Sequence, residues 1–278
     1  MTEIKVPIAG VIGNPIAHSR SPHLHRHWLH VYGIEGYYVP LHVQGQDLAE
    51  VFHALPKLGF KGVNVTLPFK ERAIELADRV SDRAALIGAA NTITFQPDGT
   101  IHADNTDGYG FIENLKHGAP GWSPRAAAIV VLGAGGAARG VLSALLEAGA
   151  PEVRLANRTR AKAEALRSDF GPRVTVVDWH GVSDAMEDAE TLVNTTSLGM
   201  TGQPDLELNL DALPRSAVVT DIVYRPLMTP LLEQAVARGN PVVDGLGMLL
   251  FQAAPGFERW FGMRPEITPE LRAAALAE

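Results

Sequence analysis

The sequence predicts an α/β protein of two domains, each built on a mostly parallel sheet, and three observations support this prediction. The chain of 278 residues is long enough for two domains that each bury a core. Short runs rich in β-branched residues alternate with amphipathic segments, which is typical of parallel strands joined by helices. A stretch dense in turn-forming residues, 118–124, separates the two halves, so we expect a domain boundary there.

In the first half, apolar runs predict strands at 7–12, 37–41 and 62–66, followed by a hairpin from 91–95 to Ile101. Helices are expected to begin near Pro22, Gln46 and Pro68, because proline is favoured at the first helical position and polar residues near a helix start can cap it.

The second half repeats the strand and helix pattern and predicts a Rossmann-type, doubly wound domain of about six strands. The expected strands are 127–132, 152–157, 174–177, 191–195, 217–222 and 241–243. After residue 245 we expect a helix at 248–254 and a second one capped by Thr268, both covering the first domain. The predicted domains are therefore 1–118 with 246–278, which would bind substrate, and 119–245, which would bind a dinucleotide.

Composition excludes several classes of function. The formal net charge of −7 gives no reason to expect a nucleic-acid partner, and the absence of cysteine rules out disulfides and a thiol nucleophile. We find neither a signal peptide nor an apolar stretch approaching the ~20 residues of a membrane span. A cytoplasmic protein that acts on a small molecule is expected.

A glycine-rich turn follows the expected strand 127–132 and precedes an expected helix. Glycine lets a backbone turn tightly and approach a pyrophosphate closely, while the helix start offers unpaired N–H groups. The pattern predicts a dinucleotide cradle, although an ordinary strand-to-helix turn would read the same way. The cradle would consist of Gly133, Ala134, Gly135, Gly136 and Ala137.

The next strand ends in Asn157, Arg158, Thr159 and Arg160, where NAD-binding proteins place a carboxylate on the ribose 2′-hydroxyl. Guanidinium groups suit a 2′-phosphate instead, since they grip it with charge-assisted hydrogen bonds. This favours NADP over NAD, and the alternative is a solvated basic loop.

Two serines precede or begin the first helix. Pro22 makes Ser21 the expected N-cap, and Ser19 lies just upstream, so two hydroxyls and several free N–H groups would converge at a positive helix end. A carboxylate would be held well there. Simple capping explains one serine but leaves the other unexplained.

Lys70 and Asp107 are candidate catalytic residues. A helix beginning at Pro68 would place Lys70 in its first turn, where its charge opposes the helix dipole, and a locally unfavourable residue is often functional. Asp107 follows an expected strand, where it could complete an Asx turn or pair with Lys70 across a cleft. Both would then lie at strand ends of one sheet.

Three histidines, His23, His27 and His30, have the spacing of one helix face, which can chelate a metal. No carboxylate or thiolate completes a ligand set nearby in the sequence. We therefore interpret them as a solvated face and expect no metal.

Seven motifs agree in order and spacing with the shikimate dehydrogenase family, which the chain resembles over nearly its whole length. These motifs are 19–22, 64–70, 90–92, 103–108, 133–137, 157–159, and 244–248 with Gln252. The resemblance implies NADPH-dependent reduction of 3-dehydroshikimate to shikimate, a step toward chorismate and the aromatic amino acids.

The resemblance also implies roles for individual residues. For the substrate they are Ser19, Ser21, Thr66, Asn91, Tyr224 and Gln252 as binding residues, with Lys70 and Asp107 bracketing the reacting oxygen. For the cofactor they are the turn Gly133 to Ala137, then Asn157, Arg158 and Thr159 at the 2′-phosphate, Ile222 and Gly245 near the nicotinamide, and Asp82.

Some alternatives stay open at this point. Lys70 could donate a proton or stabilise developing negative charge. The chain could instead be an NAD-dependent quinate/shikimate dehydrogenase, or a non-catalytic metabolite sensor with the same fold. A monomer and a homodimer are both compatible with the sequence.

Overall fold

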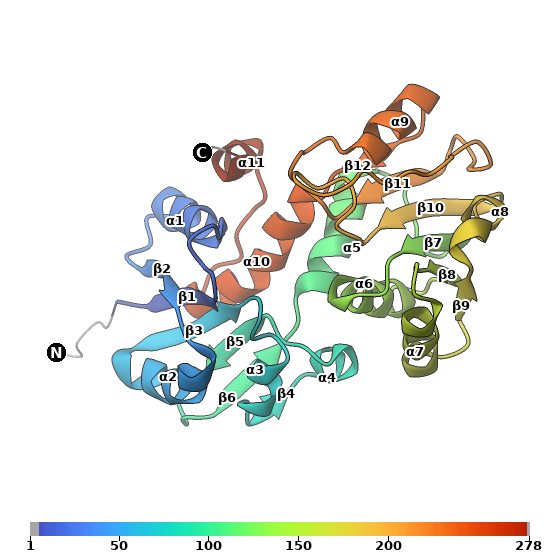
Figure 1. The fold of residues 1–278 in the computed structure, drawn as a ribbon. Coiled ribbons are helices and arrows are strands. Elements are labelled where there is room, and N and C mark those ends of the chain that lie inside the picture. Colours follow the sequence, from blue (N-terminus) through green and yellow to red (C-terminus); the bar gives the residue numbers. More distant parts are fainter. Residues whose placement is uncertain (1–5, 277–278) are drawn as a thin grey trace. The chain divides into compact units, whose positions relative to one another are not determined.

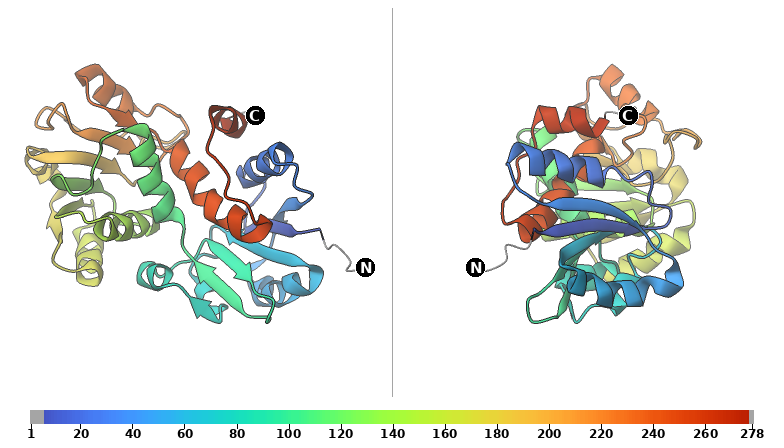
Figure 2. Two further views of the ribbon diagram at one scale, coloured as in Figure 1. Left: turned by 180° about the vertical axis from the view of Figure 1, so that it is seen from behind. Right: turned by 90° about the vertical axis from the view of Figure 1, so that its left-hand side faces the viewer.

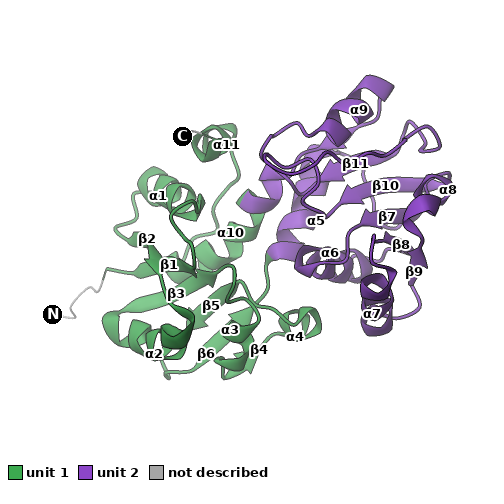
Figure 3. Ribbon diagram, in the orientation of Figure 1, with its two compact units in different colours: residues 1–106, 250–278 green, residues 107–249 purple. Residues whose placement is uncertain are grey.

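The protein is described here by a computed structural model covering residues 6–276 (Figure 1). It divides into two compact units (Figure 3). Unit 1 contains the residues up to 106 and from 250 onward, and unit 2 contains residues 107–249. Each unit has its own six-stranded sheet.

The sheet of unit 1 is mixed. Its strand order is β2-β1-β3-β5-β6-β4, with β1 parallel to β2 and β3, and with β5 antiparallel to both β3 and β6. The strands are β1 (Ile8–Gly13), β2 (Tyr37–His42), β3 (Phe60–Val65), β4 (Arg79–Val80), β5 (Thr92–Phe95) and β6 (Ile101–Asp104). The predicted hairpin is the β5–β6 pair, and Asp98 closes its turn by accepting a hydrogen bond from the Thr100 amide at 2.9 Å.

Strand β3 shows how this sheet separates its two faces. Val63 and Val65 point into an apolar core that includes Phe52 of the helix α2. Gly62 and Asn64 alternate with them and face the other side, where Gly62 leaves room for the Trp260 indole. A Cβ on Gly62 would lie 2.0 Å from the Trp260 Nε1 atom, so only glycine fits.

The helices of unit 1 cover both faces of this sheet, with α2 on one face and α1 and α10 on the other (Figure 2). They are α1 (Ser21–Val31), α2 (Leu48–Ala54), α3 (Arg72–Glu75), α4 (Asp82–Ile87), α10 (Leu246–Phe261) and α11 (Pro269–Leu276), with short 3-10 turns at Gly45–Asp47 and Leu55–Leu58. Helix α10 begins in unit 2 and continues into unit 1.

The sheet of unit 2 is parallel throughout, with the order β12-β11-β10-β7-β8-β9. This is the doubly wound order of a Rossmann-type fold. Its strands are β7 (Ala128–Leu132), β8 (Val153–Ala156), β9 (Val174–Val177), β10 (Ala189–Asn194), β11 (Val218–Asp221) and β12 (Val242–Val243). Its helices are α5 (Asp107–Gly118), α6 (Gly136–Glu147), α7 (Arg160–Phe170), α8 (Val182–Ala185) and α9 (Pro230–Arg238), with a 3-10 turn at Trp179–Gly181.

Each face of this parallel sheet is covered by its own core. Along β7, Val131 belongs to the core shared with α5 and α6, while Val130 belongs to the core on the opposite face. A parallel sheet with both faces covered needs apolar residues at every position, and all five residues of β7 are buried.

The predicted fold class is confirmed, and the expected strands lie within a few residues of the observed ones. The last helix is capped as expected, since the Leu271 amide donates to the Thr268 hydroxyl at 3.2 Å. The helix expected at 248–254 is longer and spans Leu246–Phe261 with Pro255 inside it. The helix expected near Gln46 is preceded by a 3-10 turn.

The unit boundaries differ from the expected domain limits, which placed residues 107–118 in the first domain. Those residues form α5, and α5 packs in unit 2 against α6. The contact is close at Gly108, where a Cβ would lie 2.9 Å from the Gly140 carbonyl oxygen. Between residues 6 and 276, no helix is both long and apolar enough to cross a membrane.

Candidate active site

The two serines lie where β1 leads into α1. Helix α1 begins at Ser21 itself, and the residue before it, Arg20, makes no side-chain capping bond, so the prediction that Ser21 is the N-cap is wrong. The Ser21 amide donates to the Ser19 hydroxyl at 3.4 Å, which keeps the two serines together as predicted.

Lys70 lies in a turn between β3 and α3. The predicted helix start at Pro68 is wrong, because α3 begins at Arg72, and the dipole argument for Lys70 therefore does not apply. The Lys70 carbonyl accepts a hydrogen bond from the Ala90 amide at 2.8 Å instead of continuing a helix. This bond ties the half-buried Lys70 to the segment that carries Asn91.

Unit 1 contains a hydrogen-bonded group of buried side chains around Asn91. Asn91 donates through Nδ2 to the Gln252 Oε1 at 3.1 Å, and Asn91 Oδ1 accepts from the Thr106 amide at 2.8 Å. The Thr106 hydroxyl donates to the Gln252 carbonyl at 2.9 Å. Two residues predicted to bind substrate, 161 positions apart, are thus direct partners.

Asn64 joins the same group from β3. Its Nδ2 donates to the Asn91 carbonyl at 3.0 Å and to the Thr92 hydroxyl at 3.4 Å, and its Oδ1 accepts from the Tyr38 hydroxyl at 2.7 Å. Thr66 follows two residues later, half-buried, with its amide donating to the Ile12 carbonyl. We did not predict roles for Tyr38, Thr92 or Thr106, although the repeated Asn-Thr pair at 91–92 and 105–106 was a usable signal.

Asp104, at the end of β6, is a further residue for which the sequence predicted no role. Burial opposes its ionisation, but hydrogen bonds from Arg83, Ser81 and Arg259 outweigh burial and hold the pKa of this carboxyl well below its usual range. Asp82, a predicted cofactor residue, begins α4 next to Ser81 and is exposed.

The glycine turn of unit 2 has the expected geometry. Gly133 has a φ of +104°, and a Cβ there would lie 2.8 Å from the Thr195 hydroxyl oxygen. Gly135 and Gly136 have no atoms within 4 Å of a Cβ position, so the surface beside them is open to a ligand. Helix α6 begins at Gly136 without a side-chain cap, which leaves its first amides for a phosphate. The turn fits a dinucleotide pyrophosphate.

The basic loop after β8 separates its two arginines. Arg160 is held by Asp178 at 2.6 Å and by Glu164 at 2.9 Å. Arg158 is exposed and forms no ion pair within the described residues. The Asn157 side chain donates to the Thr159 carbonyl at 2.8 Å and shapes the loop. Arg158 is therefore the guanidinium that fits a 2′-phosphate.

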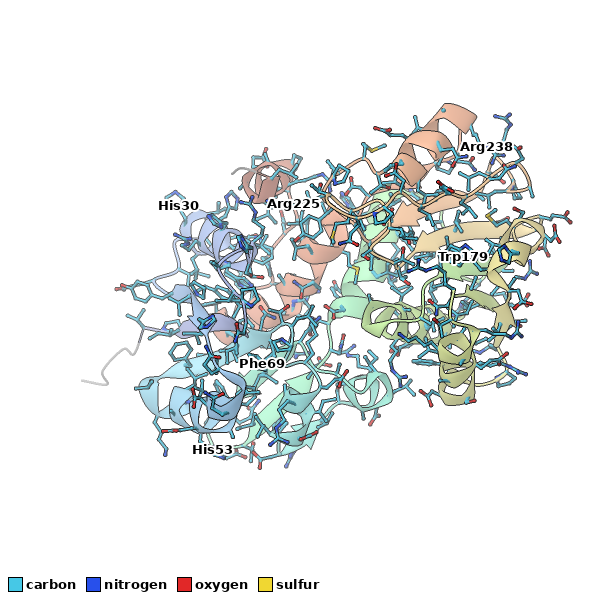
Figure 4. The ribbon with its side chains drawn as sticks, in the orientation of Figure 1. His30, His53, Phe69, Trp179, Arg225 and Arg238 are labelled. Atoms are coloured by element: carbon cyan, nitrogen blue, oxygen red, sulfur yellow. The ribbon has the colours of Figure 1, made fainter. Side chains whose placement is uncertain are left out.

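Strands β11 and β12 end beside each other in unit 2. A Cβ on Gly245 would lie 2.4 Å from the Ile222 carbonyl oxygen, so the structure brings these two predicted nicotinamide neighbours together. Tyr224 follows in the loop that also carries the exposed Arg225 (Figure 4). Asp107 is half-buried at the first turn of α5.

A buried carboxylate anchors the Tyr224 loop. Asp221 accepts hydrogen bonds from the Asn194 amide at 3.1 Å, the Thr229 hydroxyl at 2.8 Å and the Val223 amide at 2.9 Å. Burial outweighs these bonds and raises the pKa of Asp221. We did not predict Asp221 or Asn194, which bond to each other across 27 positions of the sequence.

Of the three histidines with metal-like spacing on α1, His23 and His30 are exposed and His27 is half-buried (His30 is labelled in Figure 4). Between residues 6 and 276, no group of three or more metal-ligating side chains could hold an ion.

Unit 2 is a dinucleotide-binding α/β domain. Unit 1 carries a cluster of buried, hydrogen-bonded polar side chains of the kind that orients a small hydroxylated ligand. Three family models match the chain: "Shikimate dehydrogenase substrate binding domain" at residues 11–93, "Shikimate / quinate 5-dehydrogenase" at 120–201, and "Shikimate 5'-dehydrogenase C-terminal domain" at 245–276. The chain belongs to the shikimate dehydrogenase family of oxidoreductases, as the sequence predicted.

Individual relatives agree with this membership. The chain is 98% identical over all 278 residues, and over the full length of the relative, to a protein from Dinoroseobacter shibae named shikimate dehydrogenase (NADP(+)). A Thermus thermophilus shikimate 5-dehydrogenase solved with NADP(H) and shikimate is 39% identical, with a TM-score of 0.84, covering 97% of this chain and 98% of that one.

A quinate dehydrogenase from Corynebacterium glutamicum solved with NAD is 31% identical, with a TM-score of 0.90 and coverage of 98% and 99%. The predicted NADP agrees with the name of the Dinoroseobacter protein and with the ligand of the Thermus structure.

Proposed function

We propose that the chain catalyses the reversible, NADP-dependent interconversion of 3-dehydroshikimate and shikimate on the route to chorismate and aromatic amino acids. The observation that carries the proposal is the direct bond between Asn91 and Gln252, with Lys70 tied to the same segment through Ala90. This arrangement supports the proposal, because it holds the Asn91 and Gln252 side chains in fixed orientations on a segment that the Lys70 backbone also joins.

The substrate is held by side chains with separate tasks. The Ser19 and Ser21 hydroxyls bind its carboxylate, and Thr66, Asn91, Gln252 and Tyr224 bind the carboxylate or the ring hydroxyls. Because these groups contact parts of the molecule that do not react, they orient it and contribute mainly to affinity.

The nucleotide is held by the turn Gly133 to Ala137 at its pyrophosphate and by Asn157, Arg158 and Thr159 at its 2′-phosphate. Ile222 and Gly245 flank the nicotinamide, and Asp82 contacts the nucleotide. When bound, NADPH supplies the hydride that reduces the carbonyl carbon.

Lys70 and Asp107 act on the reacting oxygen. In the reducing direction Lys70 gives a proton to that oxygen, or stabilises its developing negative charge, and Asp107 orients the ammonium group. In the oxidising direction Lys70 takes the hydroxyl proton. Both residues are retained here, as a dehydrogenase requires and a sensor does not.

The test is a screen of the purified chain at 340 nm with shikimate and quinate, each against NADP and NAD. We expect the highest kcat/KM for shikimate with NADP. Faster oxidation of quinate with NAD would assign the activity of the Corynebacterium neighbour instead. No turnover with any of the four pairs, together with shikimate binding by calorimetry, would favour a sensor.

We further propose that the protein works in the cytoplasm as a monomer or a homodimer. Cell fractionation tests the compartment, and light scattering coupled to gel filtration tests the oligomeric state.

A further inference from the structure

A stacked pair of aromatic rings lies behind the substrate-binding residues of unit 1. The rings of His25 on α1 and Tyr38 on β2 are 3.8 Å apart and nearly parallel, at 4°. Trp28, Phe257 and Trp260 surround His25, with ring centroids 5.5, 5.8 and 5.9 Å from the centroid of the His25 ring. The Trp28 and Phe257 rings are 5.2 Å apart, and His25 is fully buried. The stack fixes the plane of the Tyr38 ring.

Both rings are uncharged at working pH. Burial lowers the pKa of His25 to about 3 and raises that of Tyr38 well above its usual value. Neither nitrogen of the His25 ring has a hydrogen-bond partner within residues 6–276, so His25 acts here through packing. Tyr38 therefore presents a phenol whose position is set by the stack.

The Tyr38 hydroxyl reaches the substrate-binding residues through Asn64. It donates to the Asn64 Oδ1 at 2.7 Å. Asn64 in turn donates to the Asn91 carbonyl at 3.0 Å. One phenol is thus connected to the Asn91 group through two hydrogen bonds in series.

A buried hydroxyl that served the fold alone would need one partner, and that partner could be any backbone carbonyl. The Tyr38 hydroxyl instead bonds to a buried side chain, Asn64, which itself holds the backbone of Asn91. Fixing Asn64 and Asn91 before the substrate arrives reduces the side-chain freedom that binding would otherwise remove.

We propose that Tyr38 is a positioning residue for the substrate: its hydroxyl sets Asn64 and, through Asn64, Asn91, while His25 holds its ring. This inference rests on the proposed function. It predicts that the hydroxyl contributes to affinity for shikimate, and that it contributes little to turnover because the contacts it supports lie away from the reacting carbon.

The test is Tyr38→Phe in the full chain, which keeps the stacked ring and removes the hydroxyl. We expect the KM and the calorimetric Kd for shikimate to rise by about 3- to 10-fold, the effect of one or two lost hydrogen bonds. The kcat should stay within about twofold and the KM for NADP should not change. Because the buried Asn64 Oδ1 loses its donor, the melting temperature should fall by a few degrees.

The matched control is Tyr37→Phe, the same chemical change on the neighbouring tyrosine, whose side chain is 60% exposed. It should leave both KM values unchanged. If Tyr38→Phe matched this control, or if it lowered kcat and raised the KM for NADP together with a loss of stability, the inference would be wrong. An inactive wild type would count against the proposed function alone, since the inference is measured as a difference between variants in shikimate binding.

Should Tyr38→Phe fail to fold, Asn64→Ala breaks the same link from its other end, and the same split between KM and kcat is required. A double-mutant cycle of Tyr38→Phe with Asn64→Ala gives a second reading. Less-than-additive losses of shikimate affinity would support the coupling through the hydroxyl, and additive losses would contradict it.

Discussion

The residues predicted to bind ligands are built differently in the two units. In unit 1 the predicted substrate residues include buried side chains bonded to one another, such as Asn91 to Gln252 at 3.1 Å. In unit 2 the predicted cofactor residues include an open glycine turn and one exposed cation, Arg158. The difference teaches that the predicted substrate residues are preorganised by a network, whereas the predicted cofactor residues offer backbone conformation and charge.

The largest expected effect is on chemistry, for which we propose one residue from each unit. Lys70→Ala in unit 1 and Asp107→Ala in unit 2 should each lower kcat by ~10² or more, because a positioned acid or base contributes about that much. The kinetics of shikimate oxidation at 340 nm measure this effect. The control is Lys61→Ala, an exposed lysine on β3, which should leave kcat unchanged.

If either variant kept near-normal turnover with an intact circular dichroism spectrum, its catalytic role would be excluded. A loss confined to Lys70→Ala would change the comparison itself, because the chemistry would then belong to unit 1 alone.

Arg158→Ala tests the dependence of unit 2 on charge. Removing a guanidinium from a phosphate should lower kcat/KM with NADP by about 10- to 100-fold, and should leave kcat/KM with NAD within about twofold. The matched control is Arg160→Ala, since Arg160 is already held by Asp178 and Glu164. Equal losses from the two variants would show that the loop acts through its total charge, not through one residue.

Gly135→Ala tests the dependence on backbone shape. Its φ of −96° and ψ of −170° suit alanine, and no atom lies within 4 Å of the new methyl group, so the fold should be unaffected. The methyl group should obstruct the pyrophosphate and raise the Kd for NADP by about 10-fold, as measured by calorimetry.

Two further variants serve as controls for Gly135→Ala. Gly133→Ala, with a positive φ and a Cβ position 2.8 Å from the Thr195 hydroxyl, should lower the melting temperature as well as NADP affinity. Gly181→Ala, in ordinary contact with Val177, should change neither. Unchanged NADP binding in Gly135→Ala would mean that the pyrophosphate lies elsewhere.

The same contrast explains what could be predicted from the sequence. A glycine turn between a strand and a helix is a local pattern, and the turn at 133–137 was predicted with its residues and its geometry. The doubly wound sheet followed from repeated strand and helix segments. Site features built from neighbouring residues can therefore be found in one sequence.

The features that were missed depend on distant partners. The hydroxyl of Tyr38 meets Asn64 26 positions away, and Arg259 meets Asp104 155 positions away. A tertiary bond also accounts for one of the two wrong local predictions, because Lys70 gives its carbonyl to Ala90 instead of to a helical neighbour. The other was wrong by one position, since the helix already includes Ser21.

The smallest expected effect is on the free energy of unfolding. It compares the loss of a buried carboxylate partner in unit 1 with the loss of an exposed one in unit 2. Asp104→Asn should lower the free energy of unfolding by about 1 kcal/mol at pH 7, since Arg83 and Arg259 are partly exposed and solvent screens them. Asp169→Asn, which removes an exposed partner of Arg139, should cost less than about 0.5 kcal/mol.

The pH dependence of this difference follows from the lowered pKa of Asp104. Because the folded pKa lies below the unfolded value of about 3.9, the stabilisation is fully present above that value and is lost as the pH falls toward the folded pKa. Urea unfolding of wild type and Asp104→Asn should therefore differ at pH 7 and converge below about pH 4. A difference that persisted undiminished at pH 3 would show that the Asp104 side chain stabilises unit 1 through shape and not through its charge.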